Sequence, residues 1–140
     1  MSDRCSRLAT TIDKHMLGAV PLAPMAVGPR GLAQRTGAQV ADELGGRLLL
    51  RYVVDPQGPY GSGSTDPHWT TPTAYSPSET LTWLALPGTN AREYVWLLDP
   101  ARIAEIWGPR EVFGGHAVEY YLPRGFSATA LMLPWAIPVD

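Results

Sequence analysis

Short runs of apolar residues, separated by proline and glycine, predict a chain built from brief strands and helices. Residues 47–54 (RLLLRYVV) and 93–98 (EYVWLL) are rich in Leu, Val and aromatic side chains, and each run is followed by an Asp-Pro pair. Residues 118–122 (VEYYL) predict another strand, followed by a tight turn at 123–125. Shorter strands are expected at residues 68–73, 110–113, 130–133 and 135–139.

Helices are predicted between these strands. In residues 32–44, apolar side chains recur at near-helical spacing and two glycines follow the last of them. Residues 76–86 begin with Ser-Pro-Ser-Glu, which supplies an N-cap, a first-turn proline and a capping-box glutamate. Residues 10–17 fit a short helix, residues 18–31 an extended proline-rich linker, and residues 101–106 a turn or a single helical turn. Together these elements indicate an α+β fold.

Composition limits the class of protein. The 140 residues are 45% hydrophobic and 17% charged, which allows one domain with a core and excludes wholesale disorder. We expect a single compact domain in which residues 1–46 are an N-terminal helical or linker segment and residues 47–140 are the core. The net charge of −2 provides no basic field for a nucleic acid backbone, so the chain carries no strong nucleic-acid signal.

Cysteine and histidine usage excludes further classes. The lone Cys5 cannot form a disulfide within the chain or a cysteine-built zinc site, which predicts action in the cytoplasm of a producing or target cell. His15, His68 and His116 are widely spaced, so no metal site is expected. The apolar residues 19–27 are short and contain two prolines, so we expect no transmembrane segment, no signal peptide and no membrane partner.

Three sets of residues are candidates for chemistry. Arg51 lies within an apolar strand, where it either faces outward from a sheet edge or forms a fork for a carboxylate or diphosphate. Thr70 and Thr71 are either ordinary strand residues or braces for a cleft. Glu119 is placed by strand alternation on the face opposite its apolar neighbours, so it is either solvated or in an aromatic-lined pocket. The glycine pair at 114–115 allows a close backbone approach to a ligand.

Taken in order, these residues resemble the ADP-ribosyltransferase superfamily in its Arg–Ser/Thr–Glu form. That family has an Arg on a first core strand, a Ser-Thr-Ser-like strand followed by a helix, and a catalytic Glu on a late strand after a mobile loop. The stretch EYYLPRGF is similar to the late strand, and YVWLLDP is similar to the family's middle strand. The resemblance covers residues 47–140 and implies an ADP-ribosyltransferase-like fold of split mixed β-sheets with flanking helices.

The resemblance implies a site for NAD, bound as a substrate, and no metal. Arg51 would hold a phosphate or ribose of NAD. Thr70 and Thr71 would brace the pocket, although Thr-Thr-Pro replaces the family's Ser-Thr-Ser. Tyr75 and Trp69 would be the candidates to stack on nicotinamide.

Glu119 would be the catalytic residue. It would hydrogen-bond the nicotinamide ribose and stabilise the oxocarbenium-like charge that develops as nicotinamide leaves. The preceding loop, with Gly115 and His116, is a candidate substrate loop. Ala117 stands two residues before Glu119, where protein-modifying members often carry a second Glu or a Gln. This departure leaves open both water and an acceptor other than arginine.

The function implied is that of a bacterial toxin or effector that cleaves the nicotinamide–ribose bond of NAD and transfers ADP-ribose to an unknown macromolecular acceptor. An immunity protein would be a further partner. One alternative is an NAD glycohydrolase, which transfers to water. Another is a non-catalytic interaction or immunity-type domain, in which the five Trp and six Tyr would form a core and a binding face.

Overall fold

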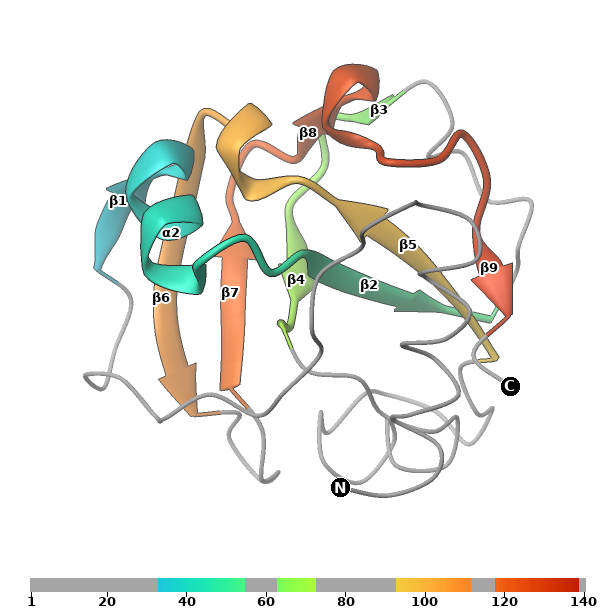
Figure 1. The fold of residues 1–140 in the computed structure, drawn as a ribbon, viewed down its shortest axis with the longest axis horizontal. Coiled ribbons are helices and arrows are strands. Elements are labelled where there is room, and N and C mark those ends of the chain that lie inside the picture. Colours follow the sequence, from blue (N-terminus) through green and yellow to red (C-terminus); the bar gives the residue numbers. More distant parts are fainter. Residues whose placement is uncertain (1–32, 55–62, 73–92, 112–117, 139–140) are drawn as a thin grey trace.

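The computed structural model describes residues 33–54, 63–72, 93–111 and 118–138 (Figure 1). These residues form nine strands, one α-helix and two 3-10 helices, so the coarse α+β class is confirmed. Within this part of the chain, no helix combines the length and apolar character needed to cross a membrane.

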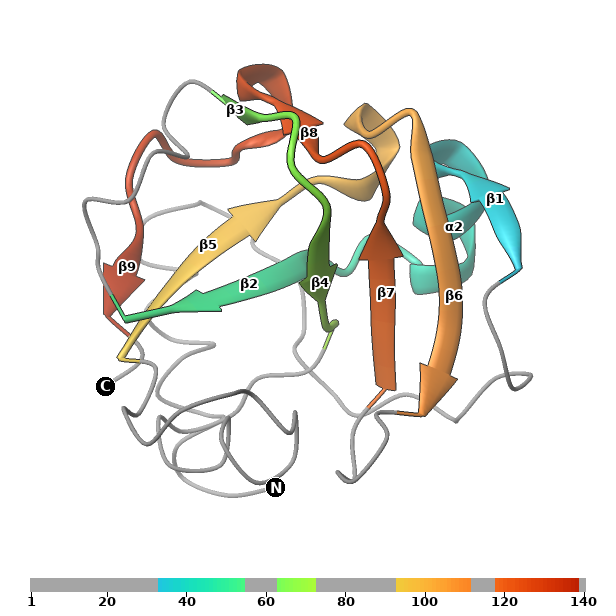
Figure 2. The ribbon, with the colours of Figure 1, turned by 180° about the vertical axis from the view of Figure 1, so that it is seen from behind.

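A four-stranded antiparallel sheet carries one half of the described structure (Figure 2). Its strand order is β1-β6-β7-β4. The strand bounds are Gln34–Thr36 for β1, Glu105–Glu111 for β6, Val118–Leu122 for β7 and His68–Thr70 for β4.

The pairing of β6 with β7 contains a register shift. Trp107 pairs with Tyr121 and Arg110 pairs with Glu119, so β6 uses one residue more than β7 between the two pairs. Such an extra residue, as in a β-bulge, interrupts the alternation of side chains along the strand. Gly108 lies in this stretch with a φ of 127°, a conformation that favours glycine. The shift places Arg110 opposite Glu119.

A three-stranded antiparallel sheet forms the other half, in the order β2-β5-β9. The short strands β3 and β8 pair with each other and form a separate two-stranded sheet. The strand bounds are Leu49–Val53 for β2, Tyr94–Leu98 for β5, Ile137–Pro138 for β9, Gly63–Ser64 for β3 and Phe126–Ser127 for β8.

The two larger sheets meet where β2 passes β4. Leu50 and Thr71 form an isolated bridge, in which each backbone N–H donates to the other residue's carbonyl at 2.8 and 3.1 Å. From this point β2 runs away from β4 toward β9, while β4 continues alongside β7 (Figure 2). Side chains next to the bridge therefore line the opening between the diverging strands.

Helix α2 (Gly37–Leu44) packs closely on the chain that leads into β6. Thr36 caps the helix by accepting from the Gln39 N–H, and the Gln39 side chain accepts from the Thr36 N–H, which completes a capping box. Gly45, with a φ of 60°, ends the helix. A methyl group added at Gly37 would lie 1.7 Å from the Ile103 carbonyl oxygen, so only glycine permits this approach.

One hydrophobic core joins the helix to both sheets. Its buried members come from α2, β2, β5, β6, β7 and β8 and from two 3-10 helical turns, η2 (Pro100–Arg102) and η3 (Ala128–Ala130), with their flanking residues. The core residues are Val40, Leu44, Leu49, Leu98, Ile103, Ile106, Val118, Tyr120, Leu122, Phe126 and Ala130. The described part of the N-terminal segment thus shares its core with the strands that follow.

Several predicted elements are confirmed within three residues at each end. The strands predicted at 47–54, 68–73 and 93–98 are present in shortened form, and the strand at 118–122 has the predicted bounds. The predicted turn at 123–125 is closed by a bond from the Gly125 N–H to the Leu122 carbonyl.

Other predictions were wrong. The first residues of the helix predicted at 32–44 form β1 instead, because residues 34–36 pair with β6. The strand predicted to begin at residue 110 begins at Glu105, and η2 takes up the start of the predicted 101–106 turn. The strand predicted at 130–133 is reduced to a bridge at Leu131 after η3. Every strand pairing in the described residues is antiparallel, so mixed strand directions are not found there.

The helices predicted at 10–17 and 76–86 lie outside the described residues, and the domain division at residue 46 stays a prediction.

Candidate functional site

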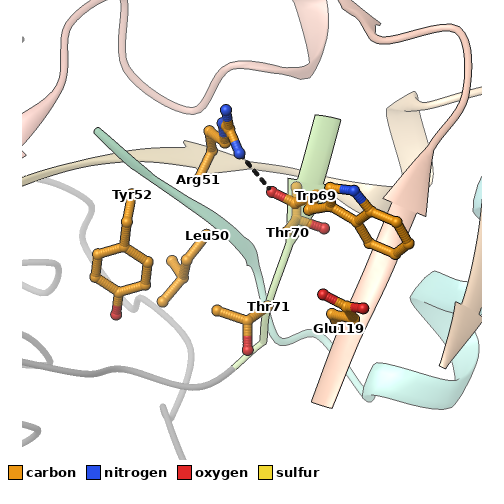
Figure 3. A pocket seen from close by; sticks show the side chains of 7 residues that line it. All are labelled: Leu50, Arg51, Tyr52, Trp69, Thr70, Thr71 and Glu119. Carbon is orange, nitrogen blue, oxygen red and sulfur yellow. Dashed lines mark hydrogen bonds between the residues drawn. The ribbon is translucent and has the colours of Figure 1, made fainter. Parts of the chain in front are cut away.

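A pocket lies at the meeting of the two larger sheets (Figure 3). It draws its lining from β2, from β4 with the residue after it, and from β7, three strands that are distant in sequence. The lining residues are Leu50, Arg51, Tyr52, Trp69, Thr70, Thr71 and Glu119. The structure therefore brings together five residues that the sequence singled out from separate segments.

Arg51 lies at the point where β2 leaves β4. Its side chain is half-buried, and Nη1 donates to the Trp69 carbonyl oxygen at 3.2 Å (Figure 3). The Arg51 side chain, rather than the backbone of β2, therefore donates to the Trp69 carbonyl on β4. The Arg51 Nε is buried and has no hydrogen-bond partner among the described residues. The guanidinium thus retains donor capacity beside the pocket.

Thr70 and Thr71 join β4 to its two neighbours. The Thr70 hydroxyl donates to the Tyr120 carbonyl on β7 at 3.1 Å, while the backbone of Thr71 bonds to Leu50 on β2. The two threonines are only 3% and 1% exposed. These contacts fix the wall of the pocket between Arg51 and Glu119.

Glu119 is a buried carboxylate rather than a solvated one. Its side chain is 9% exposed, and Oε1 accepts a bond from the Arg110 Nε at 2.7 Å. Burial raises the pKa of Glu119, and the hydrogen bond and charge of Arg110 partly oppose that rise. The predicted alternation along β7 is confirmed, because Val118, Tyr120 and Leu122 face the hydrophobic core.

Arg110 is a site residue that the sequence interpretation missed. Its guanidinium carbon lies 4.4 Å from the centre of the Trp69 ring while Nε bonds to Glu119. Tyr121 extends the aromatic surface, with its ring centre 4.5 Å from that of Trp69 and 6.0 Å from that of Trp107. Its place opposite Glu119 depends on the register of the β6–β7 pair, which the sequence pattern does not give.

The pocket itself is small. Its cavity volume is about 20 Å³, which is room for about one water molecule. The pocket therefore fits a hydroxyl or a single oxygen of a ligand, and a larger ligand must extend beyond it.

Comparisons with protein-family models, curated proteins and solved structures found no match. The residues and their geometry are therefore the basis for any functional argument. In the described part of the chain, no group of three or more His, Cys, Asp or Glu side chains is arranged to hold a metal ion. Tyr75, Gly115 and His116, which the sequence also singled out, lie outside the described residues.

His68 is buried behind the pocket on β4. Its Nε2 lies 2.8 Å from the Ser64 hydroxyl oxygen, and the ring packs on Phe126. Burial and the positive charge of Arg51 lower the pKa of His68 to about 4, with Asp66 acting in the opposite direction. The imidazole is therefore neutral in the folded protein at physiological pH.

This burial predicts a pH dependence of stability. The unfolded pKa of His68 is near 6.5 and the folded pKa is about 4, so the unfolded state binds more protons in that window. The free energy of unfolding should therefore fall by about 3 kcal/mol as the pH drops from 6.5 to 4. Urea unfolding at a series of pH values measures this, with His68→Gln as the variant without the titrating ring. An equal pH slope in His68→Gln would show that other groups cause the dependence.

Proposed function

We propose that this chain is an NAD-dependent ADP-ribosyltransferase-like toxin or effector that cleaves the nicotinamide–ribose bond and transfers ADP-ribose to a macromolecular acceptor. The observation that carries the proposal is the convergence of Arg51, Thr70, Thr71 and Glu119 on one pocket between two diverging sheets. These residues lie in three separate segments of the sequence. The proposal includes an ADP-ribosyltransferase-like fold of split sheets.

Glu119 has the environment that the reaction needs. When nicotinamide leaves with the bonding electron pair, positive charge develops at the anomeric carbon of the ribose. A fixed carboxylate stabilises that charge more than it stabilises the neutral sugar of the ground state. Because Glu119 is 9% exposed, this attraction acts with little screening by water.

Arg51 and Trp69 supply the binding functions. The Arg51 side chain lines the pocket and is half-exposed, so its guanidinium can donate to a phosphate or ribose oxygen of NAD. Trp69 offers an indole ring at the pocket on which nicotinamide can stack. Tyr75 is a second stacking candidate, and Gly115 and His116 a candidate substrate loop, on the resemblance alone.

Water as the acceptor is a second candidate, which would make the protein an NAD glycohydrolase. The pocket volume of about 20 Å³, lined in part by Glu119, accommodates one water molecule and not a bulky acceptor group. Ala117 supplies no second acidic side chain two residues before Glu119. Both activities share the first step and differ only in what attacks the ribose.

The test is the release of free nicotinamide from NAD by the purified protein, with the Glu119→Gln protein as the paired sample. Release in buffer alone identifies a glycohydrolase, and release that requires cell extract identifies a transferase. We expect one of these from the wild type and neither from the variant. A folded wild-type protein that releases no nicotinamide in either condition contradicts the proposal and favours a non-catalytic interaction domain or immunity-type partner.

A further inference from the structure

Glu119 and Trp69 present two binding elements to the same group. They lie on adjacent strands, with Trp69 paired across to Tyr121 and therefore on the same sheet face as Glu119, two residues along β7. Figure 3 shows the indole and the carboxylate together in front of β4 and β7. Trp69 offers the π face of its indole ring, and Glu119 offers a buried negative charge.

The group between them is the guanidinium of Arg110. It stacks over Trp69 at 4.4 Å from the ring centre and bonds to Glu119 at 2.7 Å. A guanidinium is flat and positively charged, so it satisfies both elements at once. The Arg110 side chain is 33% exposed, whereas that of Glu119 is 9% exposed, so the cation can be reached by solvent more readily than its partner.

We propose that Trp69 and Glu119 form a binding site for a planar cation, and that Arg110 is the exchangeable internal occupant of that site. A ligand with a flat positive ring or fork would displace the guanidinium and take over both contacts. Exchange of one cation for another leaves the buried Glu119 carboxylate paired both before and after it, which avoids the cost of an unpaired buried charge in either state. Arg110 thereby competes with the ligand for Trp69 and Glu119, and this competition lowers the affinity of the site for that ligand.

This inference rests on the proposed function and specifies it further. Two planar cations fit that chemistry, namely the pyridinium ring of oxidised NAD and the guanidinium of an arginine on a protein partner. They share the flat shape and the positive charge that the site recognises. Uncharged nicotinamide has the same ring as the first but lacks the charge.

The experiment is a titration of three small probes into the protein: 1-methylnicotinamide, methylguanidinium and uncharged nicotinamide. Binding is followed by calorimetry at pH 8. We expect Arg110→Ala to bind at least one of the two cations about tenfold more tightly than the wild type does. Arg110→Lys, which keeps the charge and loses the flat face, should lie between the two. Adding Trp69→Ala or Glu119→Gln to Arg110→Ala should remove the gain.

Arg102→Ala is the control. Arg102 pairs with Asp99 at 3.5 Å beside η2, so this variant breaks an Arg–carboxylate pair outside the sheet that holds Trp69 and Glu119. It should bind all three probes as the wild type does. Circular dichroism confirms that each variant is folded, and if Arg110→Ala does not fold, the Arg110→Lys comparison decides.

The outcomes separate cleanly. Preference for 1-methylnicotinamide assigns the site to the NAD ring, and preference for methylguanidinium assigns it to an arginine on a protein partner. Equal binding of uncharged nicotinamide, or no gain when Arg110 is replaced, overturns the inference and makes Arg110 a structural partner only. Cation binding with the expected variant pattern but no nicotinamide release would support this site while contradicting the proposed enzymatic function.

Discussion

Replacing Glu119 with glutamine is expected to lower the rate of nicotinamide release from NAD by about 10²- to 10³-fold. Glutamine has nearly the same shape as glutamate, and its amide oxygen can still accept from Arg110, which lies 2.7 Å from Oε1 in the wild type. The variant therefore removes the negative charge and little else. Since that charge acts on the transition state, kcat should fall while KM changes little.

The control for this result is Glu43→Gln. Glu43 is also a glutamate that pairs with an arginine, Arg35, and it accepts a hydrogen bond from Tyr120, but it is not among the residues that line the pocket. Its variant should release nicotinamide at a rate within about twofold of the wild type. A comparable loss in both variants would mean that the activity reports overall stability, and no loss in Glu119→Gln would exclude Glu119 from the chemistry.

Replacing Gly37 with alanine is expected to lower the free energy of unfolding by on the order of 4 kcal/mol. The added methyl carbon would lie 1.7 Å from the Ile103 carbonyl oxygen and 2.3 Å from that of Pro100. Backbone atoms cannot turn aside as a flexible side chain can, so α2 or the η2 segment must move. Denaturant unfolding of the two proteins at the same pH measures the difference.

Gly45→Ala provides the comparison. A methyl group at Gly45 meets nothing within 4 Å among the residues that the structure describes, so its positive φ of 60° is the unfavourable feature. Its cost should be about 1 kcal/mol. A cost for Gly37→Ala no larger than that of Gly45→Ala would show that α2 does not pack tightly on η2 in solution.

Sequence patterns were sufficient where local signals and tertiary structure agree. The VEYYL run has one polar position among apolar ones, and this alone placed Glu119 opposite the core-facing side chains of β7. The strand around Arg51 and the short strand of Thr70 were predicted in the same way, because each is bounded by proline or glycine. Their order along the chain then allowed one site to be predicted from three separate segments.

Features that depend on pairing between distant strands could not be predicted. Residues 34–36 have no strand pattern of their own and extend only because β6 lies beside them. Arg110 was assigned to a strand, yet its partner and its face depend on the register between β6 and β7. The depth of burial of Glu119 likewise depends on neighbouring strands, so the sequence left a solvated carboxylate open as an alternative.

The number of residues in β6 determines whether a positive charge lies beside Glu119. With regular pairing, Trp107 and Arg110 are an odd number of positions apart and would point to opposite sides of the sheet. The inserted residue near Gly108 returns Arg110 to the side of Glu119. A family of such proteins could thus gain or lose a cation at this carboxylate through insertion or deletion of a single codon in β6, with every side chain that lines the pocket left unchanged.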